Sequence, residues 1–283
     1  MRMLAAELLK LRRRWATYIV LVLLIVLMGL IFFLVGLGGR TSGASQVIRF
    51  PQAFGLINQF VFGLGSLLAV AYAAAIGGAD WNWGVFRVVI ARGESRGRYI
   101  LVKYIGLAIV ILIGCVIAFA AGILLTYFAG TIAGASVGDP FTGSGPGDIA
   151  TSLALGFPVI AERAAIGFAV AVLLRSQLAG VVVGIILYIG ESILAAVLIA
   201  TNLSGAFSGG GGFPRLGQQW YQFLPFSIGD SVLSHGPSVT GQDLEGLILT
   251  PVPLDAALAA TLIYLAAALA LVVVSVERSE ITA

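Results

Sequence analysis

The chain has 283 residues, of which 59% are hydrophobic, and its 16 Lys and Arg are set against 13 Asp and Glu. Charged residues make up 10% of the chain, against about 25% in a soluble protein. This composition excludes a water-soluble globule and leaves a membrane protein that crosses the bilayer several times. The single Cys and single His also exclude a disulfide framework and a Cys/His zinc site.

Six apolar stretches are long enough to cross a bilayer, which takes about 20 residues of helix. They cover residues 15–37, 56–79, 101–129, 149–174, 178–200 and 256–276. We therefore predict an all-α polytopic membrane protein with six transmembrane helices, in which residues 1–283 form a single domain.

The basic residues predict the orientation, because Lys and Arg accumulate on the cytoplasmic side. With the N-terminus inside, the inner flanks hold twelve of them: Arg2, Lys10, Arg12, Arg13, Arg14, Arg87, Arg92, Arg96, Arg98, Lys103, Arg175 and Arg278. The outer connections hold three: Arg40, Arg49 and Arg215. Both termini are therefore expected in the cytoplasm, and Lys103 is expected to snorkel from the inner end of the third span.

The longest outer segment, residues 202–255, precedes the last span. Its aromatic residues include Trp220, Tyr221 and Phe223, the kind of side chain that anchors at a membrane interface. Two interpretations stay open, an interfacial or partly re-entrant element and an ordinary outer loop.

The N-terminal segment predicts an amphipathic helix that lies on the inner leaflet, in contact with lipid, and leads into the first span. Leu4, Leu8, Leu11 and Trp15 recur at helical spacing. The residues assigned to this interfacial helix are Glu7, Lys10, Arg13, Arg14 and Trp15. The alternative is a plain basic flank that only sets the topology.

The inner loop of residues 80–98 combines aromatic anchors with a rim of charge. Trp81 and Trp83 are large apolar groups, and Phe86, Val89 and Ile90 share one helical face. An exposed aromatic cluster with a charged rim is typical of a partner-binding site. Interfacial tryptophans beside topology-setting arginines are the alternative.

Three motifs in chain order resemble the permease subunits of type-2 ABC exporters. The first is Glu7-Leu8-Leu9-Lys10-Leu11-Arg12-Arg13 before the first span. The second comprises Asp80, Gly84, Phe86-Arg87, Arg92, Ser95-Arg96 and Lys103, and the third is Leu224-Pro225-Phe226-Ser227. Val85 and Gly93 stand where that family has Thr and Pro.

The resemblance implies a subunit of an ATP-driven exporter in the plasma (inner) membrane of a prokaryote. Two permease chains, identical or homologous, would form the translocation path, and a separate ABC ATPase subunit would bind ATP and Mg. The inner loop would be the coupling helix that contacts this ATPase. Its contact residues would be Asp80, Trp81, Trp83, Gly84, Phe86, Arg87, Arg92, Glu94 and Arg96.

The chain itself is expected to have no catalytic residue, metal ligand or cofactor. A P-loop needs a Lys directly after a Gly, but Lys10 follows Leu9 and Lys103 follows Val102. No nucleic-acid partner is expected either, because the basic residues flank membrane spans.

Three charged residues lie within the predicted spans: Glu162 and Arg163 in the fourth and Glu191 in the fifth. At 1.5 Å rise per residue, Arg163 and Glu191 reach a similar depth in an antiparallel hairpin. An unpaired charge there costs several kcal/mol, so we predict an Arg163–Glu191 ion pair. Glu162 is expected at the dimer interface, in a water-filled path, or protonated against a hydroxyl.

Two roles for these charges stay open. The pair can fix the helix hairpin, or it can take part in substrate passage where Pro158 breaks the fourth span and opens a polar cavity. The competing functions are a stand-alone secondary transporter or channel that uses Glu162, Arg163 and Glu191, and a non-transporting membrane scaffold.

Overall fold

The computed structural model describes residues 2–39, 46–82, 95–207, 219–237, 250 and 252–278. Within these ranges the regular structure is helical, and six helices are long and apolar enough to span a membrane. They are α2 (Trp15–Gly38), the continuous run of α3 (Ala53–Asn58), η2 (Gln59–Leu64) and α4 (Gly65–Asn82), α6 (Arg96–Ala133), α7 (Gly145–Leu173), α8 (Gln177–Phe207) and α11 (Leu254–Arg278). Each of the six predicted spans matches one of them, which confirms the multi-pass helical architecture.

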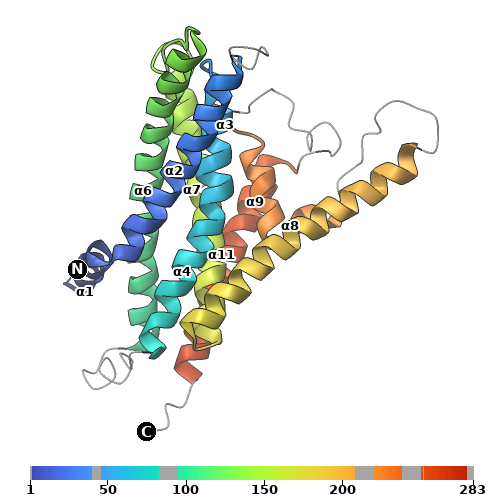
Figure 1. The fold of residues 1–283 in the computed structure, drawn as a ribbon. Helices are drawn as coiled ribbons and strands as arrows, with labels where there is room; N and C mark the ends of the chain where they lie inside the picture. Colours follow the sequence, from blue (N-terminus) through green and yellow to red (C-terminus); the bar gives the residue numbers. More distant parts are fainter. Residues whose placement is uncertain are drawn as a thin grey trace.

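Helix α7 is the most enclosed of the six. In its apolar window 72% of the residues are buried, against 6% in α8. Helices α4, α8, α9 (Pro225–Leu233) and α11 pack around it, while α2 and α6 pair beside them (Figure 1). The side chains that α7 carries are therefore the ones most completely removed from the surface of the chain.

Close packing of α7 depends on small residues at its contacts. A Cβ on Gly167 would lie 2.5 Å from the Val70 carbonyl oxygen of α4. A Cβ on Gly180 would lie 2.3 Å from the Ala171 Cβ where α8 returns beside α7. Any larger side chain at either glycine would force these helices apart.

Helix α8 starts beside α4 and α7 and then leaves the bundle at an angle (Figure 1). Its large apolar side chains are exposed along most of its length, including Leu178, Ile186, Ile193 and Val197. In a membrane this surface faces lipid or another chain, because nothing in the described part of the protein covers it. The fourth and fifth spans are predicted to form an antiparallel hairpin, but α7 and α8 lie side by side only near the turn (Figure 1).

The short helix α9 occupies the space between the diverging α8 and the bundle. Phe226, Ile228 and Val232 are buried, and the last two pack with Val159 of α7 and Ala257 of α11. Pro225 stands in its first turn, where the missing N–H costs nothing. Part of the outer segment is therefore a helix packed against α7 and α11, and its interfacial or partly re-entrant placement in a membrane stays a prediction.

The N-terminal helix α1 (Arg2–Arg13) confirms the predicted helix but not the full extent of its apolar stripe. Arg14 is extended, and α2 starts at Trp15, which is 81% exposed. The face that packs on α6 comprises Leu4, Glu7 and Leu11, which lie around Gly106. The charged Glu7 is therefore buried on this face, and its carboxylate forms an ion pair with Lys10 Nζ at 2.5 Å.

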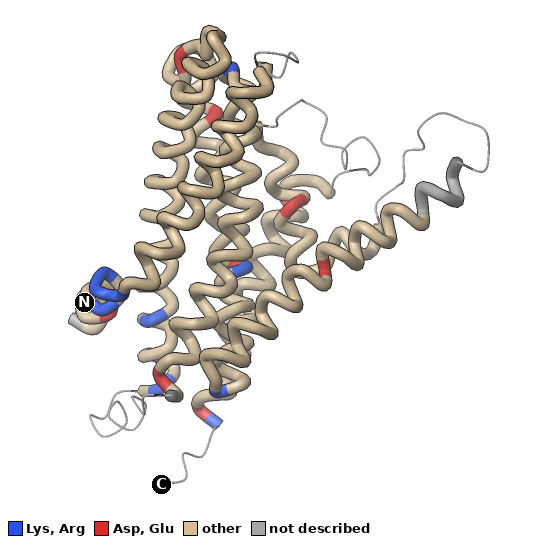
Figure 2. Tube along the Cα trace, in the orientation of Figure 1, with Lys and Arg blue, Asp and Glu red and all other residues tan. Residues whose placement is uncertain are grey.

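Charged residues gather toward the ends of the bundle and on α1, and few lie at mid-length (Figure 2). Helix α1 and the C-terminal end of α11 both lie in the lower half of this view (Figure 1). The few charges at mid-length form the site described next.

Candidate functional site

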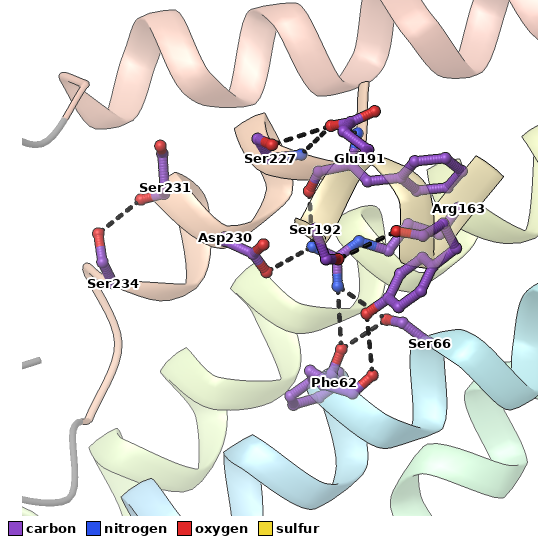
Figure 3. Close-up of polar contacts among 12 residues, drawn as sticks. Phe62, Ser66, Arg163, Glu191, Ser192, Ser227, Asp230, Ser231 and Ser234 are labelled. Carbon is purple, nitrogen blue, oxygen red and sulfur yellow. Dashed lines mark hydrogen bonds and ion pairs between the residues drawn. The ribbon is translucent and has the colours of Figure 1, made fainter. Parts of the chain in front are cut away.

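Arg163 lies at the centre of a polar site inside the helical bundle. Its side chain is fully buried, and four hydrogen bonds satisfy its two terminal nitrogens (Figure 3). Nη1 donates to the Phe62 carbonyl at 3.2 Å and to Ser66 Oγ at 3.1 Å. Nη2 donates to the Phe226 carbonyl at 2.8 Å and to Asp230 Oδ1 at 2.6 Å. One arginine of α7 thus joins the second span to α9.

The second span supplies backbone acceptors because its hydrogen-bond ladder is irregular there. Residues 59–64 form a π-helical turn between α3 and α4. The Phe62 carbonyl accepts Ser66 Oγ at 2.5 Å as well as Arg163, and the Gly63 carbonyl accepts the Tyr188 hydroxyl at 3.3 Å. Such π-helical turns are frequent at functional sites. The apolar periodicity of this span contains no sign of it.

Tyr188 brings α8 to the same site. Its ring centroid lies 5.6 Å from Cζ of Arg163, and its ring forms a T-shaped pair with the Phe226 ring, with centroids 5.2 Å apart. A guanidinium over an aromatic face is stabilised by the quadrupole of the ring. Arg163 therefore holds α4, α8 and α9 around α7.

The predicted ion pair between Arg163 and Glu191 is wrong. Arg163 pairs with Asp230, while Glu191 Oε1 accepts the N–H groups of Phe226 and Ser227 at 2.8 and 2.7 Å and the Ser227 hydroxyl at 2.9 Å. Glu191 therefore caps the N-terminus of α9, where a negative charge is stabilised by the helix dipole. The reason for the difference is α9, which enters between α7 and α8 and presents its own carboxylate.

Glu162, the neighbour of Arg163 on α7, is fully buried but differs in its contacts. Among the described residues, neither of its carboxyl oxygens has a hydrogen-bond partner. Glu162 is buried within the chain and not on its surface, and no hydroxyl of the described residues donates to it, whereas the expected water-filled path stays a prediction. The nearby Tyr104 hydroxyl donates instead to the Ala161 carbonyl at 2.6 Å. A buried carboxyl group without a partner is costly, so Glu162 is the least satisfied polar group of the site.

The expected break at Pro158 is not seen, since α7 runs through it from Gly145 to Leu173. The site therefore arises from a π-helical turn in the second span and from α9, not from a broken fourth span.

A second polar cluster, the foot cluster, comprises Asp80, Tyr99 and Lys103 at the lower ends of α4 and α6. Asp80 Oδ2 accepts the Tyr99 hydroxyl at 2.7 Å and forms an ion pair with Lys103 Nζ. All three side chains are buried. Lys103 does not snorkel toward water as predicted, because a carboxylate on the adjacent helix satisfies it inside the protein.

Two further contacts connect the ends of α4 and α6 to neighbouring helices beside the foot cluster. Arg175, in the turn between α7 and α8, places its guanidinium 5.1 Å from the Trp81 ring centroid. Arg96 Nη1 donates to the Val276 carbonyl of α11 at 3.5 Å. The two ends of the inner loop are thus held against the ends of three other spans.

The remaining residues of the predicted coupling helix lie outside the described residues. They are Trp83, Gly84, Phe86, Arg87, Arg92 and Glu94. No protein-family model matches the chain, and no curated protein matches it.

Asp230 is the functional residue that the sequence analysis missed. It stands in the motif-bearing outer segment, five residues after Pro225 in a short helix. The available signal was the proline at the start of a helical turn after an aromatic cluster, followed by an acidic residue. That signal predicts a helix but not its insertion beside α7.

Proposed function

We propose that this chain is the membrane subunit of an ATP-driven exporter, similar to the type-2 ABC exporters, in the plasma membrane of a prokaryote. It works as a dimer of identical or homologous chains and is coupled to a separate ATPase subunit that binds ATP and Mg. Both termini and the inner loop face the cytoplasm, where the ATPase hydrolyses ATP.

The foot cluster is the observation that carries this proposal. Asp80 and Lys103 are 23 positions apart, and both belong to the motif on which the resemblance rests. Their buried ion pair holds the two ends of the inner loop at a set spacing. A loop that transmits force from an ATPase needs such a fixed base, which a loop that only sets topology does not.

The same span connects the foot cluster with the Arg163 site. Asp80 stands near one end of α4, and Ser66 stands 14 residues away near the other. At 1.5 Å rise per residue this is roughly 21 Å of helix. Movement of the inner loop would reach Arg163, and through it α9 and α8, along one rigid element.

The loop itself provides the test. The chain is purified with its ATPase partner in mild detergent, and the double variant Trp83→Ala/Arg87→Ala is compared with the wild type. The variant should no longer co-purify with the ATPase, or its ATP hydrolysis should no longer drive transport. The matched control, Trp15→Ala/Arg13→Ala, removes the same residue types from the other inner segment and should keep both. Unchanged partner binding and coupling in the loop variant would contradict the proposal.

The topology has its own test. Cys115 is the single, buried cysteine, so a Cys115→Ala background allows one new cysteine at a time. Ser95 and Ser144 are both exposed. A membrane-impermeant maleimide should label Ser144→Cys in whole cells and Ser95→Cys only after lysis. The reverse pattern would overturn the orientation.

The second candidate is a stand-alone transporter, favoured by the buried Glu162, whose carboxyl group has no hydrogen-bond partner among the described residues. The chain alone is reconstituted into vesicles with an internal pH-sensitive dye. Proton flux in the wild type that is lost in Glu162→Gln would favour this second function. The exporter proposal expects no flux without the ATPase.

A further inference from the structure

A cavity of about 430 Å³ lies between α1, α2, α4 and α6, with Val61 of η2 and Ile160 of α7 at its inner wall. Its volume falls within the range of roughly 300–1,000 Å³ that is typical of ligand sites. It shares no lining residue with the Arg163 site or with the foot cluster. The proposed function therefore makes no use of it.

One end of the cavity is polar and is built at the corner between α1 and α2. Arg12, Thr17, Tyr18 and Tyr72 line this end. The Tyr18 hydroxyl donates to the Arg12 carbonyl at 2.8 Å, and Thr17 Oγ1 donates to the Leu11 carbonyl at 2.9 Å. The hydroxyls of Thr17 and Tyr72 lie 2.7 Å apart. These bonds fix the corner, and with it the position of the Arg12 backbone.

The rest of the cavity is apolar. Its walls carry aliphatic side chains from four helices, including Leu24, Leu68, Ile111 and Ile160. Gly114 also lines it, and a Cβ on Gly114 would meet no atom within 4 Å. The wall is therefore open at Gly114.

The rim of the cavity lies on the outer surface of the membrane-spanning helices. Tyr18 of α2 and Ile113 and Ile117 of α6 line the cavity and are themselves exposed. All three stand in helices apolar enough to span a membrane. A molecule can therefore enter the cavity from the surrounding lipid without crossing water.

The charge at the polar end is positive. The last turn of α1 holds Lys10, Arg12 and Arg13. Glu7 is the acidic residue of α1, and it pairs with Lys10, so no carboxylate of this helix competes for Arg12. The enrichment of Lys and Arg beside the cytoplasmic ends of spans explains the basic residues of α1. It does not explain why Arg12 lines a cavity.

We propose that this cavity binds an anionic phospholipid, with one acyl chain between α2, α4 and α6 and the phosphate against Arg12. An apolar cavity that is lined at one end by Arg12 and three hydroxyl groups matches an amphiphile with a single negative head group. The lipid would join α1 to the bundle and hold the corner at Arg14.

The binding test uses the full chain in detergent, titrated with phosphatidylglycerol or phosphatidylcholine and measured by native mass spectrometry. Phosphatidylglycerol should bind with one site tighter than the rest. Arg12→Gln should weaken that site about tenfold, as expected for the loss of one charge-assisted contact. Its matched control, Arg13→Gln, removes the same charge one residue away and should bind as the wild type does. Equal affinity for phosphatidylcholine would overturn the proposal.

The apolar part is tested by filling the cavity. Gly114→Leu places a side chain in the open wall and should abolish the tight site. Gly190→Leu on α8 is the matched control, because a Cβ there also meets no atom within 4 Å. Equal loss in both glycine variants, or in neither, would overturn the proposal.

A measurement on the unaltered protein removes any dependence on folding of the variants. Phosphatidylglycerol with a diazirine in its acyl chain is photo-crosslinked to the wild type, and the adducts are mapped by peptide mass spectrometry. Adducts concentrated on residues 17–24 and 109–117 support the site. Adducts spread evenly over the exposed faces of α8 and α11 contradict it.

Discussion

The foot cluster and the Arg163 site each bury a cation against a carboxylate, but they differ in how that cation is satisfied. Lys103 and Asp80 are both buried, and they join two long spans. Arg163 is also buried, but Asp230 is 53% exposed, and Arg163 keeps three further acceptors. Among the described residues the Lys103 cation thus has one polar partner, Asp80, whereas the Arg163 cation has four.

The number of partners of each buried cation predicts how much stability is lost when its carboxylate is removed. Breaking a buried ion pair leaves an uncompensated charge and costs about 3–5 kcal/mol. An arginine held by carbonyls and a hydroxyl loses only one of several partners when its carboxylate is removed. We therefore expect the foot cluster, at one end of α4, to be more sensitive to loss of its carboxylate than the Arg163 site near the other end.

The largest effect is expected from Asp80→Asn. It leaves Lys103 buried without a carboxylate, so stability should fall by about 3–5 kcal/mol. Thermal unfolding in detergent measures the loss. The double variant Asp80→Asn/Lys103→Met should be more stable than the single one, because no orphan charge remains. A double variant as unstable as the two losses combined would contradict the pairing.

Asp230→Asn should cost less, about 1–2 kcal/mol, because Arg163 keeps the Phe62 and Phe226 carbonyls and Ser66. The same unfolding assay applies, with Asp255→Asn as control, since Asp255 is an exposed acid near the start of α11. If Asp230→Asn were as damaging as Asp80→Asn, the contrast between the two sites would fail.

Glu191→Gln should have a smaller effect still. The amide oxygen can accept the N–H groups of Phe226 and Ser227, but the charge at the N-terminus of α9 is lost, which costs about 1 kcal/mol. Hydrogen exchange of the α9 amides should become faster while that of α11 stays unchanged. Unchanged exchange in α9 would show that Glu191 does not hold this helix.

Glu162→Gln should change stability least, by less than about 1 kcal/mol, because the carboxyl group makes no hydrogen bond to the described part of the chain that could be lost. Unfolding and transport are measured on the same preparation. A loss above about 2 kcal/mol would reveal a partner that binds Glu162. Normal stability with lost transport would place Glu162 in function rather than in folding.

The spans were predictable because apolar length alone decides them, and all six correspond to helices. The N-terminal helix was predictable up to Arg13, although the buried face included Glu7, since a pair with Lys10 lets a carboxylate turn inward. Asp80 and Lys103 stood out as motif residues, yet nothing in their spacing states that they touch. Such a contact depends on how α4 and α6 pack, which no local pattern encodes.

The Arg163 site was beyond sequence reasoning for two physical reasons. The π-helical turn at residues 59–64 leaves the apolar pattern of its span intact while it redirects the Phe62 and Gly63 carbonyls. Helix α9 has too few residues to read as a span, and its insertion between α7 and α8 decides which carboxylate meets Arg163. Arg163 and Glu191 do meet at one site, where both bond the Phe226 backbone, but the predicted hairpin could not identify α9 as the segment between them.

The most direct test of the account is the mass of the intact complex. The chain is isolated from its native membrane in mild detergent, and the assembly is weighed by native mass spectrometry with and without ATP and Mg. The account predicts two membrane chains, identical or homologous, bound to nucleotide-hydrolysing subunits in equal number. A chain that is isolated alone, or with partners that do not hydrolyse ATP, would contradict it.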